Sequence, residues 1–252
     1  MIRLEKVTKS YHDLLAVDHL DLTVNQELFV FLGPNGAGKT TTIKMMTGLL
    51  TADEGIIELD GINIKNNPKR AKQIFGYLAE HPHLYAKLTP KEFIDLLLAV
   101  YRVPPEQGYR RMQQLFEIFE MTDYADVVIE DLSGGMTKKV ALVAALIHQP
   151  RIIFLDEPTV SLDPKAARHL KDLLRGLVNR GVTVFMTTHI LQVAETMCDR
   201  VGIINKGKMC AVGTLDELRA EHGKDLSLED LFLKLTGDVF DSKIDAFLQD
   251  NG

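Results

Sequence analysis

The sequence is poor in cysteine and has no long apolar run. Only Cys198 and Cys210 occur among its 252 residues, so a disulfide framework is excluded and a reducing cytoplasm is the expected compartment. No apolar run approaches the roughly 20 residues that a membrane-spanning helix needs. The best of them, such as residues 140–147, suit buried helices. The formal net charge of −6 argues against a general nucleic-acid binder.

The sequence also has no internal repeat and no low-complexity tract. Apolar residues make up 46% of it and charged residues 25%. These proportions are typical of a globular protein with a sizeable core, and they exclude the disordered and fibrous classes. The first ten residues alternate in polarity and carry charge, so we expect a strand there and no signal peptide.

The polarity pattern predicts an α/β core that a helical segment interrupts. Predicted strands dominate up to residue 65. From about residue 82 to 149 the apolar residues recur with helical spacing, and strands and helices alternate after that. We expect strands at 2–8, 20–24, 28–32, 56–59, 62–64, 152–155, 182–186, 201–204 and 209–212, and helices at 38–49, 90–101, 106–121, 136–148, 164–180 and 190–198. The predicted organisation is a core of 1–82 and 150–225, a helical insertion of 83–149 and a C-terminal helical appendage of 226–252.

A glycine-rich segment follows the apolar run 28–32. It matches G-x-x-x-x-G-K-[ST], a loop whose backbone N–H groups surround phosphate oxygens at the start of a helix. Lys39 supplies a point charge for the β- and γ-phosphates, and the Thr40 hydroxyl can ligate Mg²⁺. The alternative is a plain turn, although the bare pattern occurs by chance in only about one per cent of such chains. The predicted ATP-binding residues here are Gly33, Pro34, Asn35, Gly36, Ala37, Gly38, Lys39, Thr40 and Thr41.

A second motif places two acids directly after the apolar residues 152–155. A buried strand that delivers Asp156 at its carboxyl end suits Mg²⁺ beside a nucleotide, and Glu157 could orient or deprotonate an attacking water. The alternative is that both acids merely cap the next helix. His189 follows the next apolar strand, where a histidine either donates to the γ-phosphate or only caps a helix.

A third motif, Leu132-Ser133-Gly134-Gly135, lies between the other two. Alone it is weak, because Ser-Gly-Gly is a common loop and serine a good helix N-cap. In this order and spacing, however, the sequence resembles the ATP-binding subunits of ABC transporters over almost its whole length. The resemblance implies an α/β P-loop NTPase core, with a mixed sheet, an antiparallel β subdomain and an inserted helical subdomain. It also implies a head-to-tail dimer, in which Ser133, Gly134 and Gly135 of one subunit complete the ATP site of the other.

The same resemblance assigns further roles. Tyr11 lies where these proteins stack an aromatic ring on adenine, and Val17 lies where an apolar residue contacts the base. An ordinary strand-end tyrosine is the alternative for Tyr11. Ser161 and Asp163 belong to the loop that crosses the dimer interface, although Asp163 also fits a plain N-cap. His189 matches the switch histidine of the family and joins Glu157 as a predicted catalytic residue.

The sequence departs from the family pattern at three positions. Glu80 stands where a glutamine usually reaches Mg²⁺ and the attacking water, and it brings a negative charge to the phosphates. Met136 follows the signature where glutamine is commonest, and Lys139 replaces the usual arginine. We expect these changes to tune the rate of hydrolysis. The predicted Mg²⁺ ligands are Thr40, Glu80 and Asp156.

The resemblance also implies a membrane-spanning permease, because the sequence offers no membrane span of its own. The permease would dock in a groove between core and insertion, which Phe93, Leu96 and Leu97 could line; helical spacing also suits them to the core of the insertion. Residues 227–237 resemble the tail of exporter subunits for drugs, antibiotics or sodium, and a solute importer stays open.

The leading prediction is therefore an ATPase that powers an exporter, cytoplasmic and peripheral on the inner face of the membrane. Its partners would be the permease and an identical or related ATPase subunit, and no nucleic acid. Two alternatives remain: a soluble ABC ATPase acting on ribosomes or DNA, and a regulatory subunit that binds nucleotide as a switch and hydrolyses it weakly.

Overall fold

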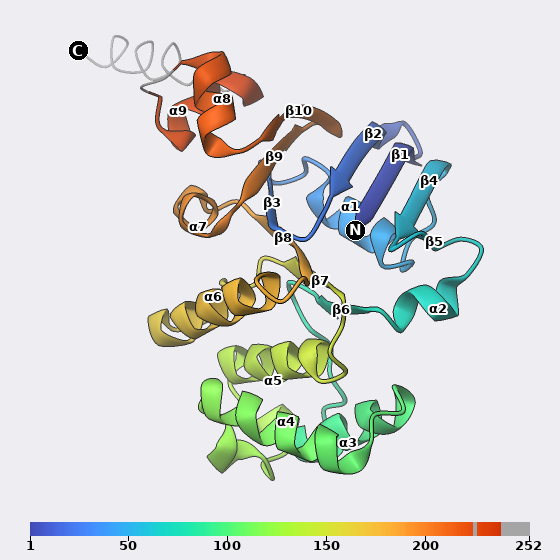
Figure 1. Ribbon diagram of the computed structural model, residues 1–252, viewed down its shortest axis with the longest axis vertical. Coiled ribbons are helices and arrows are strands. Elements are labelled where there is room, and N and C mark those ends of the chain that lie inside the picture. Colours follow the sequence, from blue (N-terminus) through green and yellow to red (C-terminus); the bar gives the residue numbers. More distant parts are fainter. Residues whose placement is uncertain (224–225, 238–252) are drawn as a thin grey trace.

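The computed structural model describes residues 1–223 and 226–237, and Figure 1 shows two β-sheets with helices around them. A four-stranded antiparallel sheet has the order β2-β1-β4-β5, and a six-stranded mixed sheet has the order β10-β9-β3-β8-β7-β6. The strands are β1 (Ile2–Tyr11), β2 (Leu14–Val24), β3 (Leu28–Leu32), β4 (Glu54–Leu59), β5 (Ile62–Asn63), β6 (Phe75–Leu78), β7 (Ile152–Asp156), β8 (Thr183–Thr188), β9 (Arg200–Asn205) and β10 (Lys208–Gly213).

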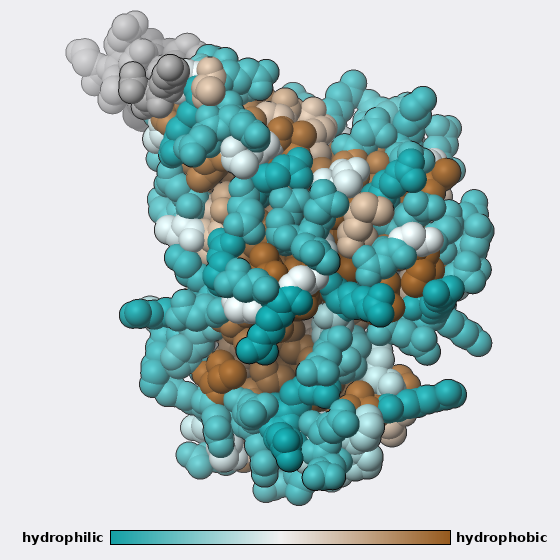
Figure 2. Space-filling model, viewed as in Figure 1, coloured by the Kyte–Doolittle hydropathy of each residue, from teal (hydrophilic) through white to brown (hydrophobic). Residues whose placement is uncertain are grey.

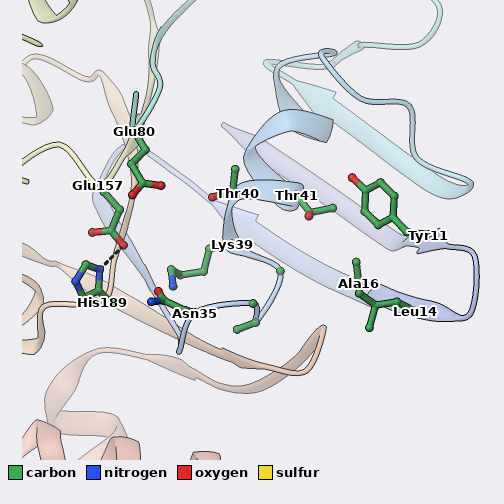
Figure 3. A pocket seen from close by; sticks show the side chains of 13 residues that line it. Tyr11, Leu14, Ala16, Asn35, Lys39, Thr40, Thr41, Glu80, Glu157 and His189 are labelled. Atoms are coloured by element: carbon green, nitrogen blue, oxygen red, sulfur yellow. Dashed lines mark hydrogen bonds and ion pairs between the residues drawn. The ribbon is translucent and has the colours of Figure 1, made fainter. Parts of the chain in front are cut away.

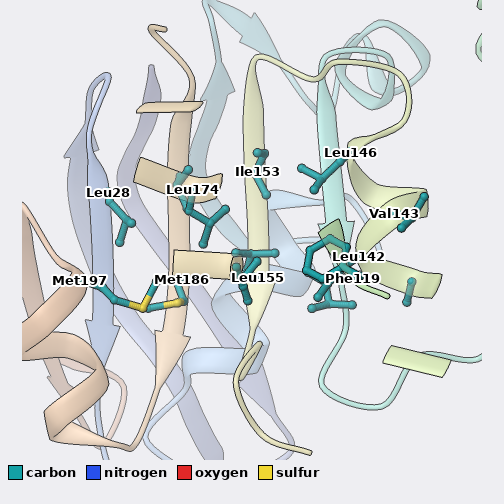
Figure 4. Close-up of a cluster of buried hydrophobic side chains, with 14 of the residues drawn as sticks. Leu28, Phe119, Leu142, Val143, Leu146, Ile153, Leu155, Leu174, Met186 and Met197 are labelled. Carbon is teal, nitrogen blue, oxygen red and sulfur yellow. The ribbon is translucent and has the colours of Figure 1, made fainter. Parts of the chain in front are cut away.

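The central strands of the mixed sheet are buried on both faces. Every residue of β3, β7 and β8 is buried, as expected for central strands of a parallel sheet that is covered on both faces. One face packs on α1 (Lys39–Met46) and the antiparallel sheet, for example through Phe29 and Phe154. The other face packs on the helices between residues 90 and 146 and on those after β7, for example through Ile153 and Leu155 (Figure 4). Because β3, β6, β7 and β8 run parallel, their carboxyl ends meet at one edge.

Three helices separate β6 from β7, within the predicted insertion of 83–149. They are α3 (Pro90–Val100), α4 (Pro105–Ile118) and α5 (Gly134–Leu146), and two short 3₁₀ turns, Thr122–Tyr124 and Ile129–Asp131, lie between α4 and α5. Thr89 and Glu92 form the capping box that starts α3, and the Ser133 hydroxyl caps α5 by accepting from the Met136 amide. Buried side chains of this segment, including Phe119 directly after α4 and Leu142 in α5, continue the core of the mixed sheet (Figure 4).

The remaining helices lie beside the mixed sheet and near the end of the described chain (Figure 1). They are α2 (Pro68–Lys72), α6 (Pro164–Val178), α7 (Leu191–Met197), α8 (Leu215–His222) and α9 (Leu228–Thr236). The sequence patterns did not predict α2 or α8. Of the predicted appendage 226–252, residues 238–252 lie outside the described residues, and the division of the chain into core, insertion and appendage stays a prediction.

One face of the described residues has an apolar hollow. On the face shown in Figure 2, hydrophobic side chains gather between α6 and the helices α4 and α5, where Leu115, Leu146 and Leu177 line a cavity. Among the helices of residues 1–223 and 226–237, none is long and apolar enough to cross a membrane.

Candidate active site

A pocket of about 450 Å³ opens at the carboxyl edge of the mixed sheet (Figure 3). Three parts of the chain contribute to it: the β1–β2 hairpin, the glycine-rich loop after β3, and the residues that follow β6, β7 and β8. Its lining consists of Tyr11, Leu14, Ala16, Asn35, Gly36, Ala37, Gly38, Lys39, Thr40, Thr41, Glu80, Glu157 and His189. The fold thus brings together motifs that lie up to 178 residues apart, from Tyr11 to His189.

The glycine-rich loop has the tight backbone that its sequence predicts. Gly36 and Gly38 have φ angles of 79° and 107°, in the region that side chains disfavour. A Cβ on Gly38 would lie 2.5 Å from the carbonyl oxygen of Ala16, so the hairpin and the loop are in close contact. α1 begins at Lys39, and its N-terminal N–H groups face the loop as an anion site requires.

Lys39 is held inside this loop. Its side chain is 7% exposed, and Nζ donates to the carbonyl oxygens of Gly33 at 2.6 Å and Pro34 at 3.1 Å. Burial lowers the pKa of Lys39, while the carboxylates of Glu157, Asp156 and Glu80 oppose that shift. Lys39 therefore lies near three acids, of which Glu80 and Glu157 line the same pocket.

The two acids after β7 occupy different positions. Asp156 is 1% exposed and accepts from the Thr187 hydroxyl at 2.5 Å, so the neighbouring strand β8 fixes its carboxylate. Glu157 lines the pocket, and its Oε1 lies 2.9 Å from His189 Nδ1. Its Oε2 is buried without a hydrogen-bond partner among the described residues. A buried carboxylate oxygen without a partner is rare in folded proteins and indicates a functional position.

The backbone of Glu157 adds to this arrangement. Its φ angle of 48° lies in the left-handed region, which costs a non-glycine residue about 1–3 kcal/mol and is common at functional sites. The Glu157 amide donates to the Thr187 hydroxyl at 3.2 Å, which helps to hold the turn. The alternative that both acids only cap a helix finds no support, because the N-cap of α6 is Asp163.

Glu80 follows β6 and lines the pocket on the same side as Glu157. Figure 3 shows its carboxylate directed toward Lys39 and Thr40. The side chain is 42% exposed, so it can move toward a bound ion. Thr40, Glu80 and the buried Asp156 together offer hydroxyl and carboxylate oxygens, the donor atoms that Mg²⁺ prefers.

The signature residues lie apart from this pocket, because none of Ser133, Gly134 and Gly135 lines it. Gly135 instead packs under the loop before α6: a Cβ there would lie 2.7 Å from the carbonyl oxygen of Ser161. Asp163 in that loop caps α6 through the Ala166 amide at 2.8 Å and pairs with Lys139 at 3.0 Å. These two contacts hold the pKa of Asp163 below its ordinary value.

Two residues of the hairpin were predicted to contact a base. Tyr11 is 43% exposed and lines the pocket, where its ring is accessible. Val17 is fully buried in the core and does not line the pocket, so its predicted contact with the base stays a prediction. Its neighbours Leu14 and Ala16 line the pocket instead. Simple alternation could not have indicated them, because the pairing of β1 with β2 has an irregular register between Val17 and Leu15.

A sequence profile described as ABC transporter matches residues 17–160 of the chain. The chain belongs to the ABC transporter family. It is 36% identical over 243 residues to the probable multidrug ABC transporter ATP-binding protein YbhF of Escherichia coli, covering 94% of this chain and 42% of YbhF. It is 35% identical over 230 residues to the linearmycin resistance ATP-binding protein LnrL of Bacillus subtilis, covering 91% of this chain and 74% of LnrL.

Solved structures of the ABC family have the same fold. The structure of an ATP binding subunit of an ABC transporter superposes with a TM-score of 0.90 at 30% identity, over 94% of this chain and 99% of that one. The dimeric ABC transporter cassette MJ0796 gives a TM-score of 0.79 at 28% identity, over 85% and 99%. The predicted family and the predicted α/β fold class are confirmed. The chain spans about two fifths of the length of YbhF.

Proposed function

We propose that the chain binds and hydrolyses ATP and thereby powers an ABC-type exporter. The observation that carries this proposal is the joint lining of one pocket by Lys39, Glu157 and His189. Water would attack the γ-phosphorus, the bond to the ADP oxygen would break, and Glu157 would accept the proton of the water. The His189 ring would donate a hydrogen bond to the phosphate and stabilise the negative charge that develops there.

The nucleotide would lie along the pocket from the hairpin to the two acids. Tyr11 would stack on the adenine, with Leu14 and Ala16 beside it, and the loop amides and Lys39 would hold the phosphates. Mg²⁺ would be held by Thr40 and Glu80, with Asp156 acting directly or through water. The ion supplies charge neutralisation between the phosphate oxygens.

We also propose that two subunits associate head to tail around ATP. The support is geometric: Ser133 and the glycines at the start of α5 form an anion site that does not line the pocket of their own subunit. One nucleotide per chain leaves that site free for the nucleotide of a neighbour. The related cassette MJ0796 has a dimeric structure, which supports the association of two subunits.

A groove between the mixed sheet and the helical insertion is the proposed docking site for the permease. It has a volume of about 510 Å³ and an apolar lining that includes Tyr77, Leu84 and the two predicted residues Phe93 and Leu97. Phe93 also belongs to the buried core, so it lines the groove and packs in the core of the insertion at the same time. Leu96 is 42% exposed and does not line the groove.

Export and localisation are part of the same proposal. YbhF is named for probable multidrug transport, LnrL for linearmycin resistance, and a protein of Rhizobium meliloti, 36% identical over 213 residues, for Nod factor export. We propose that this chain serves an exporter in the same way, bound to the inner face of the membrane through its permease.

A mixing experiment tests the composite ATP site. Lys39→Ala removes the phosphate contact, and Ser133→Arg blocks the signature, so each variant alone is expected to be inactive. A mixed dimer contains one site with both parts intact, so mixing should restore part of the phosphate release, roughly a quarter of the wild-type sites. If the mixture stays inactive while wild type turns over, the head-to-tail site is wrong. If wild type binds ATP and never turns over, the chain is a nucleotide switch.

A further inference from the structure

Lys138 is a buried cation outside the pocket. It lies in α5 with 2% of its surface exposed, as buried as the two acids of the active site. Within the described part of the chain, no carboxylate comes within 4.0 Å of its ammonium group, so no direct ion pair compensates for its burial. A buried ammonium is costly unless other groups satisfy it, and a simple structural role would be served better by an apolar side chain.

Two backbone carbonyls satisfy this ammonium group. Lys138 Nζ donates to the carbonyl oxygen of Glu157 at 2.6 Å and to that of Glu80 at 3.4 Å. These two residues follow β7 and β6, and their carboxylates line the pocket. One side chain thus holds the main chain of two acidic pocket residues that are 77 positions apart in the sequence.

The bond to Glu157 acts on a backbone that needs support. The left-handed φ angle of 48° persists only if the surroundings fix it, because the conformation is unfavourable for a residue with a side chain. The Thr187 hydroxyl holds the amide of Glu157, and Lys138 holds its carbonyl. Together these bonds fix the peptide groups on both sides of the Glu157 Cα, and with them the direction of its carboxylate.

We propose that Lys138 is a positioning residue for ATP hydrolysis, whose ammonium group fixes the Glu157 and Glu80 carbonyls and so orients both carboxylates in the pocket. This inference rests on the proposed ATPase function. Burial lowers the pKa of Lys138, and the carboxylates of Glu80, Glu157 and Asp156 oppose that shift. The same helix begins at the signature, so the contact also connects the pocket to the face that would meet a partner subunit.

Steady-state kinetics of the full chain test this role. Lys138→Met keeps the length of the side chain and removes the donors. Because a misplacement of about 1 Å can cost on the order of 100-fold in rate, we expect kcat to fall about 10- to 100-fold. The KM for ATP should stay within about threefold, since Lys138 does not line the pocket. Lys138→Arg should recover much of kcat, because a guanidinium can donate to both carbonyls.

A double variant separates positioning from general support of the fold. If Lys138 acts through Glu157, then Lys138→Met should add less than about threefold to the loss caused by Glu157→Gln in single-turnover hydrolysis. Lys69→Met, an exposed change of charge in α2, is the control and should match wild type. If Lys138→Met does not fold, Lys138→Gln carries the same prediction, since its shorter amide cannot reach both oxygens.

The outcomes are distinct. Wild-type kcat in a folded Lys138→Met or Lys138→Gln variant would overturn the inference, and so would fully additive losses in the double variant. A kcat loss that Lys138→Arg fails to relieve, and that follows the loss of thermal stability, would reduce Lys138 to a structural residue. A wild-type chain without turnover would instead overturn the proposed ATPase function.

Discussion

Replacing Glu157 by Gln removes the proposed base while changing little else. The amide oxygen can occupy the position of Oε1 and keep the 2.9 Å contact with His189 Nδ1, and the amide nitrogen takes the place of the unpaired Oε2. Size and burial stay the same, so the fold and the ATP affinity should survive. Only the proton acceptor is lost.

The expected cost follows from general base catalysis, which contributes about 10²–10⁴-fold to a rate. At about 1.36 kcal/mol per factor of ten, the barrier to hydrolysis should rise by about 3–5 kcal/mol. Because ATP then binds faster than it is hydrolysed, an ATP-bound dimer should accumulate. Phosphate release measures the first effect, and light scattering at saturating Mg-ATP measures the second.

Glu106→Gln, in the first turn of α4 and outside the pocket, is the matched control and should behave as wild type. The reasoning about Glu157 would be refuted by phosphate release within a few-fold of wild type. A Glu157→Gln chain that stays monomeric at high protein and ATP concentration would refute the link between slow hydrolysis and the dimer.

Three further changes have defined outcomes. Lys39→Ala removes a charged phosphate contact and should cost roughly 1.5–3 kcal/mol of ATP binding, so equal calorimetric affinities would contradict the loop assignment. Glu80→Gln should improve metal-free ATP binding and weaken its Mg²⁺ dependence, since a carboxylate repels phosphate unless a cation lies between them; superimposable Mg²⁺ titrations would remove Glu80 from the metal site. Asp163→Ala removes the N-cap of α6 and should lower the unfolding free energy by about 1 kcal/mol near neutral pH. Because the folded protein lowers the pKa of Asp163, the stability difference is present above the ordinary value of 3.8 and should vanish as the pH falls through the folded pKa; a pH-independent difference in denaturation would contradict this.

The sequence predicted those parts of the site that local patterns encode. The apolar runs at 28–32 and 152–155 form β3 and β7, and the glycine-rich loop and the acids follow them as expected. Capping signals at Thr89 and Asp163 also start the predicted helices. In each case the pattern and the structure it specifies lie within about ten residues, so tertiary packing does not override them.

Features that depend on tertiary contacts escaped prediction. Val17 was assigned by resemblance, and the structure buries it in the core while Ala16 lines the pocket. Lys138 appears in the sequence as one of two adjacent lysines in a helix, and nothing local distinguishes it from Lys139. Only the packing of α5 against β6 directs Lys138 to backbone carbonyls and Lys139 to Asp163.

The mixed sheet explains why such distant residues meet with defined spacing. The phosphate loop, His189, Glu157 and Glu80 follow β3, β8, β7 and β6, which are neighbours in that order. Three strand spacings of about 4.8 Å place the first and last of these about 14 Å apart, a span that suits the phosphates, the ion and the attacking water. The pairing of Leu32 with Thr188, and of Asp156 with Thr187, aligns the strand ends. A slip of one residue along β7 would turn Asp156 to the other face of the sheet and displace Glu157. The proposed chemistry therefore requires the register in which the strands pair.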